Sequence, residues 1–226
     1  MIKRDMYLKK LIGFKDHPLI KVITGIRRCG KSTLLELFRE YLLENGVKND
    51  QIISINFEDM NFSNLDDAQK LHDFVDSRLK KNAKNYVFLD EIQKVVDFQK
   101  AVDGLYIKKN VDIYITGSNA HLLSGELATL LSGRYVEIEM LPLSFKEYIE
   151  FTGKNDLSRK FADYVRYSSF PFAVYLNNDA GKVRDYLSGI YNTVILKDVV
   201  AKKKIADMLM LESVVRFMFD NIGSLM

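Results

Sequence analysis

Gly25-Ile26-Arg27-Arg28-Cys29-Gly30-Lys31-Ser32 is the stretch of sequence that decides the fold. Its spacing, Gly-x-x-x-x-Gly-Lys-Ser, is typical of a loop whose main-chain N–H groups surround phosphate. The residues from Leu19 to Thr24 before it have the apolar pattern of a buried strand. Those from Lys31 to Asn45 after it have apolar positions at helical spacing. Strand, loop and helix in this order predict a P-loop nucleotide-binding protein.

Individual residues of this loop have separate expected roles. Gly25 and Gly30 permit positive φ angles and place no Cβ in the path of a phosphate. We expect the Lys31 ammonium to bind the β and γ phosphates and the Ser32 hydroxyl to ligate Mg²⁺. The predicted nucleotide contacts are Gly25, Ile26, Arg27, Arg28, Cys29, Gly30, Lys31, Ser32 and Thr33.

Three residues within the loop have alternative interpretations. Cys29 lies beside a helix N-terminus and three cations, which lower the pKa of a thiol, so it is either redox-sensitive or contributes only its main chain. Arg27 and Arg28 either contact nucleotide or a partner subunit, or are solvated charges. Cys29 is also the one cysteine of the chain, which excludes an internal disulfide and favours a reducing cytoplasm.

A pair of acids, Asp90 and Glu91, follows the apolar stretch Tyr86 to Leu89. Ionised carboxylates at the end of a buried strand need a cation or hydrogen-bond donors. We expect Asp90 to hold Mg²⁺, directly or through water, and Glu91 to polarise the attacking water. The pattern is weak alone, but downstream of a phosphate loop it predicts hydrolysis of the bound nucleotide.

Two further polar residues are candidates for the same chemistry. Asn119 follows the apolar stretch Ile113 to Thr116, so it either orients the water and senses the γ-phosphate or caps a turn. Arg134 precedes the last predicted strand, and it is either a surface charge or an arginine that reaches a neighbouring subunit's γ-phosphate. An arginine of the latter kind raises turnover about 10³- to 10⁵-fold.

The rest of the first 141 residues alternates between strand and helix patterns. Short strands are predicted at 51–57, 86–89, 112–116 and 135–138, with helices at 65–80 and 98–108. This alternation predicts a parallel sheet with helices on both faces.

The strand pattern ends after Pro142, where Ser144 and Glu147 form a capping-box pattern at the start of a helix. We therefore expect an α/β core at 1–141, and at 142–226 a helical lid followed by the start of a truncated C-terminal segment. The apolar helix predicted at 208–219 lacks an obvious partner, and we expect a missing C-terminal part or a neighbouring subunit to cover it.

Composition limits the class of protein. The chain has 226 residues, 47% of them apolar and 28% charged, with a formal net charge of +3, which is typical of a folded globular protein. Neither a signal peptide nor an apolar run of about 18 residues is present in the sequence, so we expect a cytoplasmic protein without a membrane partner. Direct DNA binding is an alternative suggested by the lysines at 80–81, 108–109 and 202–204, although such charge runs are usually solvated.

Five blocks of sequence stand together in order and resemble one family. They are Gly25-Ile26-Arg27-Arg28-Cys29-Gly30-Lys31-Ser32-Thr33-Leu34-Leu35, Phe88-Leu89-Asp90-Glu91-Ile92-Gln93, Thr116-Gly117-Ser118-Asn119-Ala120, Ser132-Gly133-Arg134-Tyr135 and Leu141-Pro142-Leu143-Ser144-Phe145-Lys146-Glu147-Tyr148. Together they resemble the archaeal and bacterial AAA-type ATPases called AAA_14, usually found with a DUF4143 C-terminal region.

This resemblance implies a five-stranded sheet of order 5-1-4-3-2, with Glu91 as the catalytic acid, Asn119 as a sensor and Arg134 as an arginine finger. It also implies a homo-oligomer completed through Arg134, and a winged-helix-like segment and nuclease-like domain beyond residue 226. Relatives often have a glycine pair before Phe-Pro, where this sequence has Ser168 and Ser169, so the resemblance assigns no role to that turn.

The sequence favours an Mg²⁺-dependent ATPase that couples its nucleotide state to a C-terminal or partner domain, with DNA as a partner through the missing C-terminal region. The alternative is a nucleotide-gated assembly module with negligible turnover. A small-molecule kinase has no need of Asp90, Glu91, Asn119 and Arg134 together. ATP is preferred because no guanine-reading Asn-Lys-x-Asp motif occurs.

Overall fold

The computed structural model describes residues 3–117, 131, 133–194, 199–200 and 207–223. The chain divides into two compact units, residues 1–183 and residues 184–226. The first unit contains the sheet, the helices that cover it and the first helices after the sheet. No helix within the described ranges is long and apolar enough to cross a membrane.

The centre of the first unit is a five-stranded sheet in which each neighbouring pair is parallel. Its strands are β1 (Ile20–Gly25), β2 (Ile52–Asn56), β3 (Asn85–Asp90), β4 (Val111–Thr116) and β5 (Tyr135–Met140). They lie in the order β2-β3-β4-β1-β5, which read from the other edge is 5-1-4-3-2. The predicted sheet order is therefore confirmed.

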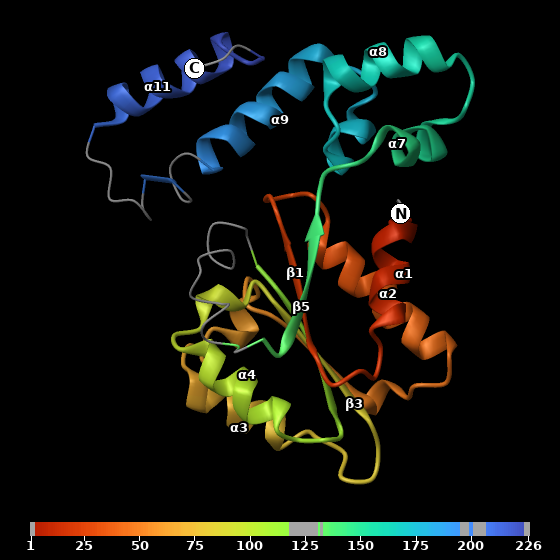
Figure 1. Cartoon of the computed structure of the whole chain (residues 1–226), viewed down its shortest axis with the longest axis vertical. Helices are drawn as coiled ribbons and strands as arrows, with labels where there is room; N and C mark the ends of the chain where they lie inside the picture. Colours follow the sequence, from red (N-terminus) through yellow and green to blue (C-terminus); the bar gives the residue numbers. More distant parts are fainter. Residues whose placement is uncertain (1–2, 118–130, 132, 195–198, 201–206, 224–226) are drawn as a thin grey trace. The chain divides into compact units, whose positions relative to one another are not determined.

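Helices cover both faces of this sheet, as Figure 1 shows. They are α1 (Asp5–Gly13), α2 (Lys31–Glu44), α3 (Ala68–Asp76) and α4 (Phe98–Tyr106), with short 3₁₀ helices at Asn49–Gln51, Met60–Phe62 and Ile92–Lys94. Helices α1 and α2 pack on one face, and α3 and α4 on the other. The prediction of helices on both faces is confirmed, whereas α1 was not predicted.

Alternation within the strands explains the two separate cores. Side chains of a strand point to opposite faces in turn. Accordingly Ile20 and Val22 of β1 belong to the cluster under α3 and α4, while Ile23 belongs to the cluster under α1 and α2. All six residues of β1 are buried, as expected for a central strand of a parallel sheet.

Helices follow the sheet from residue 145 onward. They are α7 (Phe145–Thr152), α8 (Leu157–Tyr167), a 3₁₀ helix at Pro171–Leu176, α9 (Ala180–Thr193) and α11 (Met208–Asp220). Helix α7 begins with the predicted capping box, because the Ser144 side chain accepts from the Glu147 N–H and the Glu147 carboxylate accepts from the Ser144 N–H. In α11 the apolar side chains of Leu209 and Phe217 are exposed, as is that of Ile222 just beyond its end.

Candidate nucleotide-binding site

The loop at 25–30 lies at the carboxyl edge of the sheet. Strand β1 ends at Gly25 and α2 begins at Lys31. Strand β3 ends with Asp90 and β4 with Thr116, at the same edge and on neighbouring strands. Ligands of open parallel sheets bind beyond the carboxyl ends of the strands. The topology thus brings the loop and the predicted acids together.

Backbone geometry explains both glycines of the loop. Gly30, the N-cap of α2, has φ 104°, a left-handed conformation that favours glycine. A Cβ on Gly25 would lie 2.3 Å from the Met140 carbonyl oxygen and 2.8 Å from Cys29 Sγ, so a side chain does not fit there. The N-cap residue Gly30 has no side chain that could cap the N-terminus of α2. A helix N-terminus without such a cap suits an anion, as a phosphate loop requires.

Lys31 is buried at the centre of this loop. Its Nζ donates to the carbonyl oxygens of Gly25 at 3.1 Å and Ile26 at 3.4 Å. The same Nζ lies 3.8 Å from Oε1 of Glu91, which is too long for a hydrogen bond. The ammonium is therefore held inside the loop by neutral carbonyl oxygens, with the Glu91 carboxylate as a longer ion-pair partner.

Asp90 connects the loop to β4. Its carboxylate accepts hydrogen bonds from the hydroxyls of Ser32 and Thr116. Burial raises the pKa of this carboxyl, and the two hydroxyls offset the rise only in part. A buried carboxylate whose ionised form is disfavoured gains from a cation, so Asp90 and Ser32 fit the predicted Mg²⁺ ligands. Thr116 belongs to a motif that resembles the family, but the sequence predicted no role for it.

Glu91 follows directly, in a left-handed conformation with φ 55° and ψ 45°. Its main-chain N–H donates to Thr116 Oγ1 at 3.0 Å, and Gln93 Nε2 donates to its Oε2. The left-handed backbone is unusual for a residue other than glycine and is frequent at functional sites. Thr116 and Gln93 therefore orient the predicted catalytic acid, a role that the sequence pattern did not reveal.

The surroundings of the Cys29 thiol differ from those predicted from the sequence. Its side chain is fully buried, and burial raises the pKa of the thiol more than the nearby cations Lys31 and Arg4 lower it. The prediction of a lowered pKa was wrong, because it counted the charges beside the loop and not the apolar core beneath it. The alternative interpretation, that Cys29 contributes its main chain, agrees with this geometry.

Arg134 and Asn119 complete the predicted set. Arg134 precedes β5 at the amino edge of the sheet, where its side chain lies 3.9 Å from an oxygen of Asp103 and 5.7 Å from the centre of the Tyr106 ring. Strand β1 separates the two edges by roughly 16 Å, so Arg134 does not reach the loop of its own chain. Asn119 lies outside the described residues.

A comparison with known families agrees with this geometry. The family AAA_14, described as an AAA domain, matches residues 17–149. The chain belongs to this family. The match includes the loop, the acidic pair and the capping box at the start of α7.

Relatives of this AAA protein are longer. It is 43% identical over its full length to an uncharacterized protein of Haemophilus influenzae, covering 57% of that protein. It is 34% identical to an uncharacterized protein of Methanocaldococcus jannaschii over 91% of this chain and 46% of that one. The chain thus spans about half the length of these curated relatives.

A solved structure shows the same fold. The Walker-type ATPase of Pyrococcus abyssi aligns with 90% of this AAA protein and 76% of its own chain, with a TM-score of 0.54 and 18% sequence identity. At that identity the likeness shows the fold.

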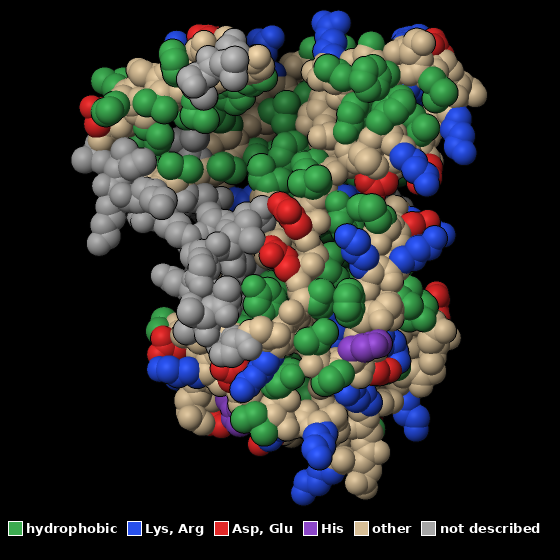
Figure 2. Space-filling view, in the orientation of Figure 1, with side chains coloured by type: hydrophobic (Ala, Val, Ile, Leu, Met, Phe, Trp, Pro, Cys, Tyr) green, Lys and Arg blue, Asp and Glu red, His purple; other side chains and the backbone are tan. Residues whose placement is uncertain are grey.

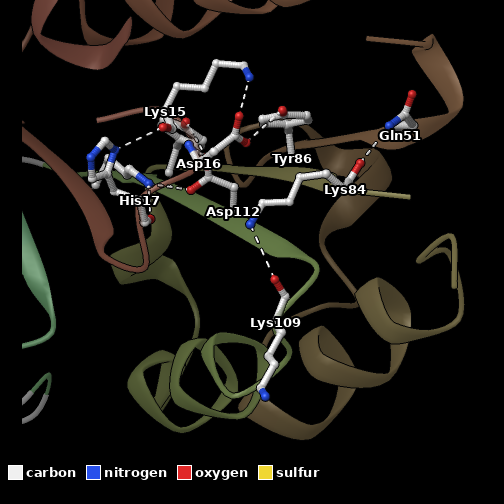
Figure 3. Close-up of polar contacts among 10 residues, drawn as sticks. Lys15, Asp16, His17, Gln51, Lys84, Tyr86, Lys109 and Asp112 are labelled. Atoms are coloured by element: carbon white, nitrogen blue, oxygen red, sulfur yellow. Dashed lines mark hydrogen bonds and ion pairs between the residues drawn. The ribbon is translucent and has the colours of Figure 1, made fainter. Parts of the chain in front are cut away.

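The amino edge of the AAA domain contains a second buried lysine, Lys21. Figure 3 labels Asp16, His17 and Asp112, which surround it. Lys21 Nζ lies 2.5 Å from Asp112 Oδ1 and donates to the His17 carbonyl at 2.9 Å. Asp112 Oδ2 accepts from the Tyr114 hydroxyl at 2.8 Å and the Asp16 N–H at 2.9 Å. Both oxygens of Asp112 are therefore occupied, and burial lowers the Lys21 pKa. This network fixes residues 16–17 to the sheet.

Proposed function

We propose that this chain binds MgATP in the loop Gly25 to Thr33 and hydrolyses it. The observation that carries the proposal is the meeting of Lys31, Asp90 and Glu91 at one edge of the sheet. The Lys31 ammonium matches the negative charge of a nucleoside triphosphate. The carboxylates of Asp90 and Glu91 match the positive charge of its cation. Membership of an AAA domain family, whose members are generally ATPases, supports the same reaction.

Each residue has a distinct part in the proposed reaction. The main-chain N–H groups at the start of α2 and the Lys31 ammonium bind the β and γ phosphates. Ser32 and Asp90 would hold Mg²⁺, which neutralises charge that develops on the phosphates. Glu91 accepts a proton from the attacking water, and Gln93 and Thr116 keep Glu91 in position.

A neighbouring copy of the chain completes the proposed site. The position of Arg134 at the amino edge supports a role on another subunit's γ-phosphate, because the loop of its own chain is out of reach. The proposal therefore includes a homo-oligomer. Asn119 remains the proposed γ-phosphate sensor on the basis of its place after β4.

DNA contact is proposed only through a further C-terminal region. Of the lysines that suggested it here, Lys80 lies 3.2 Å from an Asp50 oxygen and Lys108 pairs with Asp76. On the face seen in Figure 2, Lys and Arg side chains are scattered among acidic and apolar ones. Coupling of nucleotide state to such a C-terminal region is part of the same proposal.

Two substitutions test the reaction. Glu91→Gln keeps the shape of the side chain but not the base, so it should bind MgATP and lose about 10²- to 10⁴-fold in turnover. Lys31→Ala should lose MgATP binding itself. Phosphate release measures turnover and calorimetry measures binding, with Glu58→Gln on the exposed surface as the matched control.

Turnover of wild-type level in Glu91→Gln would refute the assignment of the base. MgATP binding by the wild-type protein without measurable phosphate release would instead identify the alternative, an assembly module gated by nucleotide.

A further inference from the structure

Arg4 is the largest fully buried side chain among the described residues, with 2% of its surface exposed. It is the N-cap residue of α1 and was assigned no role from the sequence. A buried guanidinium is costly unless its N–H donors are paired, and replacement by apolar residues is often neutral or stabilising. The guanidinium lies over the Tyr7 ring, 4.9 Å from its centre, but Tyr7 and Leu11 already anchor α1 by burial, so its other contacts need an explanation.

The guanidinium of Arg4 joins three separate segments of chain. Nη1 donates to the Cys29 carbonyl in the phosphate loop at 2.8 Å. Nη2 donates to the carbonyl oxygens of Leu141 at 2.7 Å and Pro142 at 3.4 Å, in the link after β5. Nε donates to Glu147 Oε1 in the first turn of α7 at 2.8 Å. One side chain thus contacts the loop, the link and the lid helix.

The bond to Cys29 bears directly on phosphate binding. The Cys29 carbonyl and the Gly30 N–H belong to one planar trans peptide unit, so they point in opposite directions. By holding the carbonyl on its own side, Arg4 fixes the direction of the Gly30 N–H, a donor at the N-terminus of α2. A loop that closes on a phosphate has to move or lock this peptide unit.

The bond to Glu147 connects the same guanidinium to the lid. Glu147 uses Oε1 for Arg4, while Oε2 accepts from the N–H and the hydroxyl of Ser144, both at 2.9 Å. Glu147 therefore links the Arg4 guanidinium to the capping box of α7. The lid also approaches the loop directly, because a Cβ on Gly30 would lie 4.0 Å from Cγ of Pro171.

We propose that Arg4 is a positioning residue that couples occupancy of the phosphate loop to the position of α7 and the 3₁₀ helix at Pro171–Leu176. Nucleotide phosphate sets the peptide between Cys29 and Gly30, Arg4 follows its carbonyl, and Glu147 transmits the change to α7. Coupling of this kind is reciprocal, so a partner that moves α7 alters nucleotide affinity to the same extent. The proposal rests on the proposed nucleotide site.

The test uses the absence of tryptophan from the sequence. A single reporter is introduced by Phe172→Trp, at a half-exposed position next to Pro171, and its emission is measured with and without saturating MgADP. Hydrogen exchange of the α7 amides, with and without MgADP, is the second readout. Glu147→Gln and Arg4→Lys are then made in this background, and Glu150→Gln, which changes an exposed acid on the same helix, is the matched control.

We expect MgADP to change both readouts in the reporter protein and in Glu150→Gln. Glu147→Gln supplies one oxygen where two are used, and the single ammonium introduced by Arg4→Lys would not span Cys29 and Glu147 at once. Both variants should bind MgADP about fivefold more weakly and lose most of the response at saturation. A merely structural role would lower thermal stability and leave the saturated response unchanged.

Two negative results have different meanings. Failure of the reporter protein to bind MgADP would refute the proposed function, and this inference with it. Binding without any change in emission or exchange, or a full response in both variants, would overturn the role of Arg4 and leave the nucleotide site intact.

Discussion

Two buried lysines lie at opposite ends of strand β1, and they have different partners. Lys21 lies near the start of the strand, and Lys31 follows the loop after its end. Lys21 lies 2.5 Å from Asp112, and both carboxylate oxygens of Asp112 accept hydrogen bonds. Lys31 donates to two neutral carbonyl oxygens and lies 3.8 Å from Glu91. The Lys21 ammonium is paired at short range within the chain, whereas the Lys31 ammonium has a carboxylate only at 3.8 Å and can bind an anion from outside.

Arg134 provides the strongest test of this difference between the two edges of the sheet. It lies at the amino edge, with Lys21 and Asp112, yet it is proposed to act in catalysis. Arg134→Ala should lower turnover about 10³-fold while MgATP affinity and thermal stability stay near those of the wild type. Phosphate release at several protein concentrations is the measurement, with exposed Arg159→Ala as the control.

Mixing two variant proteins tests whether Arg134 acts between subunits. Arg134→Ala protein mixed with Glu91→Gln protein should recover part of the activity, because some interfaces then join an intact Glu91 to an intact Arg134. Mixtures as inactive as the separate variants would argue that Arg134 does not act between subunits.

The two lysines should differ most clearly in stability. Lys21→Met leaves Asp112 buried without its cation and should lower the free energy of unfolding by about 3–5 kcal/mol. Lys31→Met should cost less, since its carboxylate partner Glu91 is farther away and more exposed than Asp112. Urea unfolding monitored by circular dichroism compares them.

A second substitution provides the control for this difference. Asp112→Asn, added to Lys21→Met, removes the unpaired charge and should recover most of the loss. Equal losses for Lys21→Met and Lys31→Met would remove the distinction between the two ends of β1.

The smallest expected effect concerns pH and Asp90. Since burial raises the pKa of this carboxyl in the folded protein, its contribution to stability is complete below its ordinary value near 3.8 and declines as the pH rises through the folded value. Asp90→Asn should therefore increasingly exceed the wild type in melting temperature from about pH 4 upward. Nucleotide-free samples melted at pH 4 and pH 7 provide the comparison, and a constant difference would contradict it.

Much of the fold could be predicted from the sequence because its signals are local. Apolar runs predicted all five strands, and the loop spacing and the capping box at Ser144 marked the starts of α2 and α7. The sheet order came from the family resemblance. Of the site, Lys31, Ser32, Asp90 and Glu91 could be named because each lies within a short motif.

The remaining features depend on contacts that are distant in sequence. Arg4 and Glu147 are 143 residues apart, and Lys21 and Asp112 are 91 apart, so no local pattern pairs them. The pKa of Cys29 was misjudged for the same reason, because burial by the core outweighs the charges beside it in sequence. Thr116 needed the neighbouring positions of β3 and β4 before its contact with Asp90 could be known.

The left-handed backbone of Glu91 has a consequence for laboratory evolution. That conformation costs a residue other than glycine about 1–2 kcal/mol, and Glu91→Gly would avoid this cost. A library of variants selected only for thermal stability should therefore enrich glycine at position 91. Its members should lose ATP hydrolysis as their stability increases. Screens for robust variants of this chain should score catalysis in the same round.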